Sequence, residues 1–196
     1  MNTERMNLLC TGLLLTALVS ACAGPVTPSP TQGAPPTEPV ALRCLFAGTG
    51  ATLAFEGKRL NFTCVRDGPN EIGLLGDVVL EDAGWTIDKA TTGHGDAGFS
   101  LLSSEKVLIE YIELTDGTLC AFAGTGATLA FEGKRLNFTC ESHENQQIGL
   151  LGEVMRGDEG WMIEKGAIEH GDGGFTLVSS QQVPIAALSV VPVAEP

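Results

Sequence analysis

Two short segments carry residue types that can bind a metal ion or act as a general base. His94 and Asp96 flank one glycine, and His170 and Asp172 repeat the arrangement. A histidine and an aspartate at this spacing can ligate a metal, or the aspartate can orient a histidine base. A typical zinc site needs three or four protein ligands. Since the flanking glycines are typical of tight turns, we interpret both HGDxG segments as turns, with a metal-dependent protein or enzyme as the alternative.

The sequence contains no other recognisable catalytic set. Ser103-Ser104 has no base at a known spacing, and the only histidine shared by both copies of that region lies in the HGDxG turn. The cysteines lack the CxxC spacing of redox catalysts. We therefore assign no catalytic residue and no cofactor, and expect a non-enzymatic protein.

Four cysteines have the spacing of two structural disulfides. Cys44 and Cys64 are separated as Cys120 and Cys140 are, within two nearly identical segments. An even number of cysteines indicates disulfides when a chain reaches an oxidising compartment, which the N-terminal pattern described below predicts. Since the segments are copies, we predict Cys44–Cys64 and Cys120–Cys140, each linking the first strand of a copy to its third. Pairing between the copies remains the alternative.

The same segments carry two basic pairs, Lys58-Arg59 and Lys134-Arg135. They supply four of the eleven basic residues of a chain whose formal charge is −13. We predict a binding face that is presented twice, which would increase avidity for an anionic polymer or an acidic partner. Two alternatives stay open, namely protection of a strand edge by lysine and recent copying of the segment. The side chains expected to face water are Glu56, Lys58, Arg59, Asn61 and Thr63, with Glu132, Lys134, Arg135, Asn137 and Thr139.

These residues belong to a repeat with a period of 76 residues. Residues 44–64 match 120–140 at 20 of 21 positions, whereas residues 65–114 match 141–190 at 21 of 50. Each copy shows the alternation of apolar and polar residues that is typical of strands, as in Leu53 to Phe55 and Leu60 to Cys64 around a Glu-Gly turn. We predict an all-β protein with two tandem antiparallel modules, residues 41–116 and 117–196, of about six strands each.

Specific turns and core residues follow from the same pattern. Thr115-Asp116-Gly117 joins the last strand of the first copy to the first strand of the second, which favours an antiparallel pair. Trp85 and Trp161 are interpreted as core residues. Because a module of this size has a small core, one disulfide per module would help to stabilise it.

The N-terminus has the pattern of an export signal. Arg5 precedes an apolar run, Leu8–Ala21, that ends in small residues. Val19-Ser20-Ala21-Cys22 resembles the lipobox of bacterial lipoproteins. The resemblance covers about the first 22 residues and implies cleavage of a signal peptide, residues 1–21, and acylation of Cys22, for example with palmitate. It also implies anchoring in the bacterial cell envelope, on the outside of the cytoplasmic membrane or in the outer membrane.

Residues 22–40 resemble a spacer between the lipid and a folded part. Six of the ten prolines lie here, and the segment has little to bury, so we expect an extended tether. The acidic composition argues against nucleic acid as a partner. The expected partners are the membrane, through the lipid on Cys22, and an envelope or extracellular protein or polymer. A purely structural envelope component is a further alternative.

Overall fold

The computed structural model describes residues 41–67, 70–140 and 146–193, and in this part the chain is all-β. The prediction of six strands per repeat is confirmed. No helix in these ranges could span a bilayer. The strands are β1 (Leu42–Phe46), β2 (Ala54–Phe55), β3 (Lys58–Asp67), β4 (Asn70–Glu81), β5 (Gly84–Gly95), β6 (Gly98–Leu114), β7 (Leu119–Phe122), β8 (Ala130–Phe131), β9 (Lys134–Cys140), β10 (Gln146–Gly157), β11 (Gly160–Gly171) and β12 (Gly174–Pro192).

Short turns join several pairs of neighbouring strands, and the strands of each pair are antiparallel. Glu56 and Gly57 both have positive φ, 49° and 80°, which matches the right-handed twist of a two-residue hairpin. Between β6 and β7, the Leu114 amide donates to the Thr118 carbonyl at 2.9 Å. Register pairs such as Ile112 with Cys120 confirm the antiparallel arrangement expected from the Asp-Gly turn.

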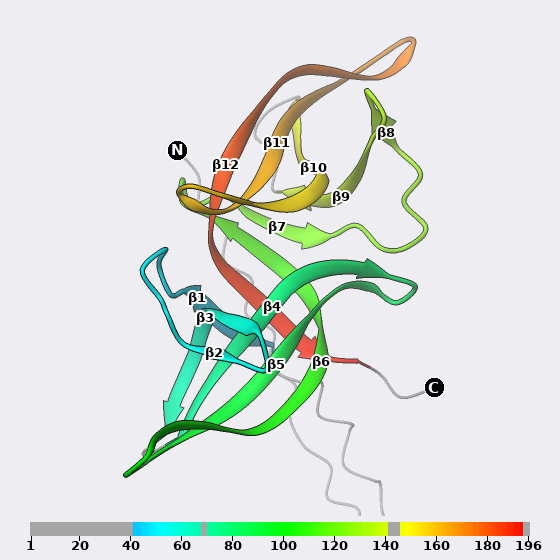
Figure 1. Ribbon diagram of the computed structural model, residues 1–196. Helices are drawn as coiled ribbons and strands as arrows, with labels where there is room; N and C mark the ends of the chain where they lie inside the picture. The colour runs from blue at the N-terminus through cyan, green and yellow to red at the C-terminus, as the bar shows by residue number, and fades with distance from the viewer. Residues whose placement is uncertain (1–40, 68–69, 141–145, 194–196) are drawn as a thin grey trace, which may run out of the picture. The chain divides into compact units, whose positions relative to one another are not determined.

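The two repeats exchange the ends of their last strands. The first part of β6 pairs with β5, while its end pairs with β7 and β12; the first part of β12 pairs with β11, while its end pairs with β6 and β1. This exchange closes two sets of six hydrogen-bonded strands, in which the last strand pairs with the first. Their orders are β1-β3-β4-β5-β6-β12 and β7-β9-β10-β11-β12-β6. In Figure 1, β12 runs from the second set of strands into the first. The described residues of both repeats accordingly belong to one compact unit.

The exchange is symmetric in register. Ile112 and Leu188, which occupy equivalent positions of the two repeats, pair with each other where β6 meets β12. The flanking pairs are Leu114 with Ile185 and Ile109 with Val190. These two pairs are equivalent to each other, because Val190 and Ile185 lie 76 residues after Leu114 and Ile109. The repeats are therefore related by a local two-fold arrangement, and each repeat completes the other.

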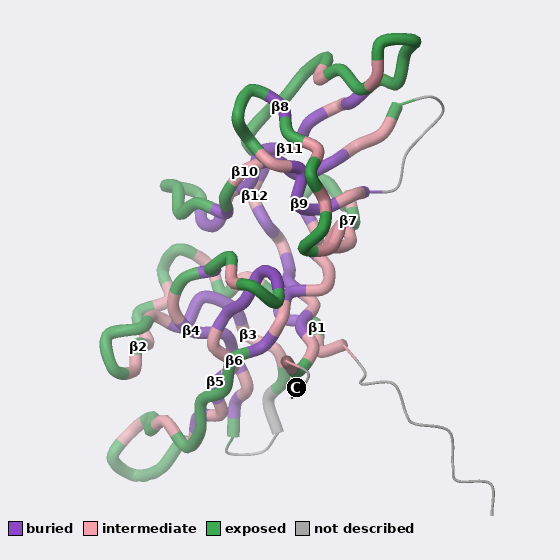
Figure 2. Tube along the Cα trace, turned by 90° about the vertical axis from the view of Figure 1, so that its right-hand side faces the viewer, coloured by how far each residue is buried: buried purple, intermediate pink, exposed green. Residues whose placement is uncertain are grey.

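A single hydrophobic core extends through both repeats. It contains Trp85 and Trp161, exposed by only 2% and 3%, which confirms their assignment as core residues. Figure 2 shows the buried stretches along the strands and the exposed ones at the hairpin ends. Smaller clusters, around Leu60 in the first repeat and Leu136 in the second, lie apart from the main core.

Strict alternation along β3 would place Leu60 and Phe62 on the same face, but the two side chains lie in different clusters. Leu60 packs with Leu75, whereas Phe62 packs in the main core. The register of β3 against β4 shifts between Leu60 and Phe62. Such a bulge redirects side chains that strict alternation would place together.

Candidate functional site

Both predicted disulfides are present in the structure. Cys44–Cys64 links β1 to β3 and Cys120–Cys140 links β7 to β9, each with a sequence separation of 20. Each bond thus connects the first and third strands of its repeat. The alternative pairing between repeats is excluded.

The HGDxG segments form the β5–β6 and β11–β12 turns. His94 and His170 are exposed, and their rings lie 4.8 Å and 4.9 Å from those of Phe99 and Phe175. Asp96 and Asp172 are likewise exposed. Among the residues that the structure describes, no three His, Cys, Asp or Glu side chains are grouped so as to hold a metal ion.

The two basic pairs make the same internal contacts in both repeats. Lys58 is paired with Asp88 and Lys134 with Glu164. Arg59 donates to the Thr49 carbonyl, and Arg135 donates to the carbonyls of Thr125 and, at 3.3 Å, Gly124. The lysines tie β3 to β5 and β9 to β11, while the arginines hold the loops before β2 and β8. These contacts provide a structural reason for the near-identity of the two segments.

Asn61 and Asn137 were expected to face water, and this expectation was wrong. Their exposed fractions are 4% and 3%, and their amide nitrogens donate to the Gly76 and Gly152 carbonyls, both at 2.6 Å. Each of these glycines has a positive φ, 74° and 69°. The ladder between β4 and β5 shifts beside Gly76, and the ladder between β10 and β11 shifts beside Gly152. The asparagine satisfies a carbonyl that the bulge removes from the ladder, and it is buried for that reason.

A pocket opens beside each bulge. The first-repeat pocket has a volume of about 520 Å³ and the second-repeat pocket about 680 Å³. Both are lined by the Lys-Arg-Asn frame, which we define as Lys58, Arg59 and Asn61 in the first repeat and Lys134, Arg135 and Asn137 in the second. The structure therefore brings all four predicted binding-face residues into two equivalent pockets.

Each pocket is completed by the other repeat. Arg156 of the second repeat lines the first-repeat pocket, and Leu80, its equivalent, lines the second-repeat pocket. Val78, Val79 and Trp85 extend the apolar wall of the second-repeat pocket. The strand exchange thus produces composite pockets, which could not be inferred from either repeat alone.

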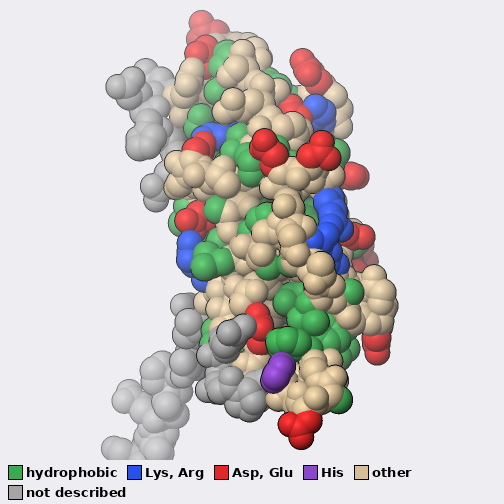
Figure 3. Space-filling model, turned by 60° about the vertical axis from the view of Figure 1, so that its left-hand side comes forward, with side chains coloured by type: hydrophobic (Ala, Val, Ile, Leu, Met, Phe, Trp, Pro, Cys, Tyr) green, Lys and Arg blue, Asp and Glu red, His purple; other side chains and the backbone are tan. Residues whose placement is uncertain are grey.

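Ion pairs set the charge of the pocket walls. The carboxylate of Asp88 raises the pKa of Lys58 by accepting its hydrogen bond, and Lys106 lowers the pKa of Glu81 in the same way. In the second repeat, Lys134 lowers the pKa of Glu164. Figure 3 shows basic, acidic and hydrophobic side chains interspersed on one face of the protein. The basic pairs are consequently small positive areas on a surface that also carries acidic and hydrophobic side chains.

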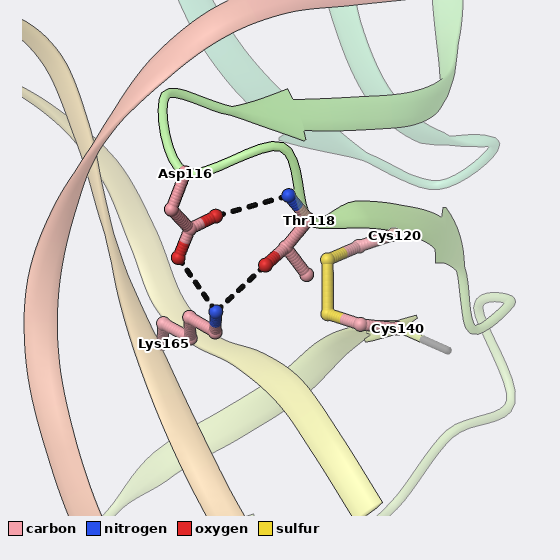
Figure 4. The surroundings of a disulfide bond; sticks show 5 residues. All are labelled: Asp116, Thr118, Cys120, Cys140 and Lys165. Carbon is pink, nitrogen blue, oxygen red and sulfur yellow. Dashed lines mark hydrogen bonds and ion pairs between the residues drawn. A yellow bond between two sulfur atoms is a disulfide. The ribbon is translucent and has the colours of Figure 1, made fainter. Parts of the chain in front are cut away.

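One charged contact of the second repeat, between Lys165 and the turn that joins the repeats, has no equivalent among the described residues of the first. Lys165 donates to Asp116 and Thr118, both at 2.7 Å, close to the Cys120–Cys140 bond (Figure 4). Hydrogen bonding from Lys165 lowers the pKa of Asp116 to about 2. The equivalent of Lys165 is Lys89, which pairs with Glu105 instead. This contact ties the turn between the repeats to β11.

Several pocket residues were not singled out by sequence reasoning. Gly76 and Gly152 end the IGLLG motif that both repeats share, so the motif was a signal for the bulge. Asp88 and Glu164 differ in type, and no local pattern identifies them as partners of the lysines. The predicted signal peptide, the predicted lipidation site Cys22 and the predicted tether of residues 22–40 lie outside the described residues.

The sequence matches no protein-family model, and comparisons with curated proteins and with solved structures also gave no match.

Proposed function

We propose that this chain is a lipid-anchored, non-enzymatic binding protein of the bacterial cell envelope. The observation that supports this proposal is the presence of two pockets at equivalent places, each lined by a Lys-Arg-Asn frame and completed by the other repeat. Pockets of roughly 300–1,000 Å³ with a few polar groups among apolar ones are typical of small-ligand sites. The binding residues of the proposal are Lys58, Arg59, Lys134 and Arg135.

The proposed partner is an envelope or extracellular molecule with an anionic group. Arg59 and Arg135 donate to backbone carbonyls, which do not neutralise their charge. A polymer or protein that reaches both pockets would gain avidity. The formal charge of −13 disfavours nucleic acid, because the phosphate backbone would be repelled.

The anchoring part of the proposal depends on Cys22. Cys22→Ser should abolish incorporation of labelled palmitate and move the protein from the membrane fraction to the soluble fraction. The spacer after Cys22 supports this expectation, since it separates the folded part from the lipid headgroups. Unchanged labelling of the variant would refute lipidation at this residue.

A fragment screen tests the binding part. The Cys22→Ser chain, labelled with ¹⁵N, is screened by NMR against small anionic and neutral fragments. Shifts should cluster at the amides of the two Lys-Arg pairs and decrease in the Arg59→Glu/Arg135→Glu variant. Lys89→Met removes a charge outside both pockets and is the matched control. Shifts confined to His94 and His170, or scattered over the surface, would contradict the proposal.

A further inference from the structure

We propose that the second-repeat pocket binds a small amphipathic carboxylate, with its apolar part against the wall from the first repeat and its carboxylate at Arg135. This inference deepens the proposed function, because it names the ligand class of one of the two pockets. It concerns the second-repeat pocket alone. Four observations support it, namely unpartnered donors, an uncompensated charge, an apolar wall and the contrast with the first-repeat pocket.

Two nitrogen donors in the pocket lining are unpartnered. Within the described residues, Trp85 Nε1 and Arg135 Nε are the buried side-chain nitrogens without a hydrogen-bond partner in the protein. Both side chains line the second-repeat pocket. A buried donor left unsatisfied costs about 1–3 kcal/mol, and native proteins contain few of them. Both nitrogens are shielded from solvent, so a ligand oxygen would satisfy Arg135 Nε once the guanidinium turns toward the pocket.

The charge of Arg135 indicates that the acceptor is anionic. Lys134 in the same lining is neutralised by Glu164, whose side chain is exposed by only 8%. Arg135 donates to the carbonyls of Gly124 and Thr125 and has no ion pair with a carboxylate among the described residues. Glu153, an exposed carboxylate in the lining, opposes an anion and so limits the affinity. Guanidinium groups favour carboxylates because their N–H donors match the two oxygens.

The opposite wall is suited to an apolar group. Val79, Leu80 and Met155 line the pocket and are exposed by 48%, 44% and 50%. Covering them would remove apolar surface from water, at roughly 25 cal/mol per Å². The wall lies within the same lining as the two donors, so one ligand with an apolar part and a carboxylate can use both.

The first-repeat pocket lacks this combination. Arg156 replaces Leu80 at the position contributed by the other repeat, and Glu81 and Lys106 form an ion pair in the lining. Trp161, the equivalent of Trp85, is not part of that lining. The proposal therefore specifies one carboxylate site per chain, although the frame occurs twice.

Tryptophan fluorescence gives a direct test, because the chain has two tryptophans. In a Cys22→Ser/Trp161→Phe background, Trp85 is the reporter, and decanoate is titrated with decyltrimethylammonium as the cationic control. Decanoate should change the emission saturably with a stoichiometry near one. Arg135→Met should weaken binding about tenfold, whereas Lys89→Met, which removes a charge outside both pockets, should leave it unchanged.

Glu153→Gln keeps the test decisive if Arg135→Met fails to fold. This exposed residue should tolerate the change, and its neutralisation should strengthen decanoate binding. Equal responses to decanoate and decyltrimethylammonium, no saturable response, or equal effects of Lys89→Met and Arg135→Met would overturn the carboxylate site. If other fragments still map to the two pockets in the NMR screen, the ligand class is wrong and the binding function stands. If none do, both proposals fail.

Discussion

The two pockets share a frame, but they differ in their outer walls. Beside the frame, the first-repeat pocket has the Glu81–Lys106 ion pair, whereas the equivalent positions in the second repeat are Gly157 and Gln182. The first pocket is consequently charged, and the second is larger and more apolar on one side.

The comparison shows that the frame residues are the same in both repeats, whereas the wall residues have diverged. The frame supports the fold in each repeat, because Asn61 and Asn137 satisfy the bulge carbonyls and the arginines hold the loops. A change in the frame should therefore destabilise the protein, whereas a change at an exposed wall residue such as Leu80 should alter mainly the pocket. Identity between the repeats marks a structural requirement here, and under the proposed function the divergent walls would determine specificity.

The largest expected effect tests the equivalence of the repeats. Replacing Cys44 and Cys64 by alanine, or Cys120 and Cys140, should lower the free energy of unfolding by about 3 kcal/mol in each case, since the closed loops have equal length. Denaturant unfolding measures both variants. A clearly unequal loss would show that one repeat depends more on its disulfide.

Two glycines should distinguish the repeats. A Cβ at Gly160 would lie 2.7 Å from the Phe46 ring, and one at Gly84 would lie 3.0 Å from Phe122; both glycines have positive φ, 122° and 132°. Gly160→Ala should destabilise by about 2–3 kcal/mol and Gly84→Ala by somewhat less, through overpacking and backbone strain. Gly171→Ala, where a Cβ would meet nothing within 4 Å, is the control in thermal unfolding. Equal stability of all three variants would argue against these contacts.

Removing the buried amide should affect both repeats alike. Asn61→Ala and Asn137→Ala each leave a bulge carbonyl without its donor, at a cost of about 1–3 kcal/mol. Urea unfolding measures the loss, and Ser100→Ala, at an exposed position near the β5–β6 turn, is the control. A loss in only one repeat would break the equivalence of the frames.

The smallest effect belongs to the contact that only the second repeat has. Asp116 has a folded-state pKa lowered from 3.8 to about 2, so its contribution is present above pH 3.8 and is lost as the pH falls through about 2. Asp116→Asn should therefore cost at most about 1 kcal/mol at pH 7, since the pair is partly exposed. The difference from the wild type should disappear near pH 2. Unfolding at both pH values, with and without added salt, checks this expectation.

Local patterns in the sequence determined much of this protein. Alternation of apolar and polar residues predicted the strands, the 76-residue period predicted the modules, and the duplicated cysteines predicted the disulfide pairing, which the structure confirms. The Asp-Gly turn before Cys120 was also recognisable. These features depend on residues that are close in the chain or repeated in it, so the sequence displays their cause directly.

Tertiary structure alone decided the exchange of strand ends and the composite pockets. The alternation of apolar and polar residues predicts that Asn61 is exposed, but its side chain is buried because it donates to the carbonyl of Gly76 at the bulge. Leu80 and Arg156 each line the pocket of the other repeat because β6 and β12 cross between the two sets of strands. Such contacts join residues far apart in sequence, and their register depends on how whole sheets close. Local alternation and spacing carry no information about that closure.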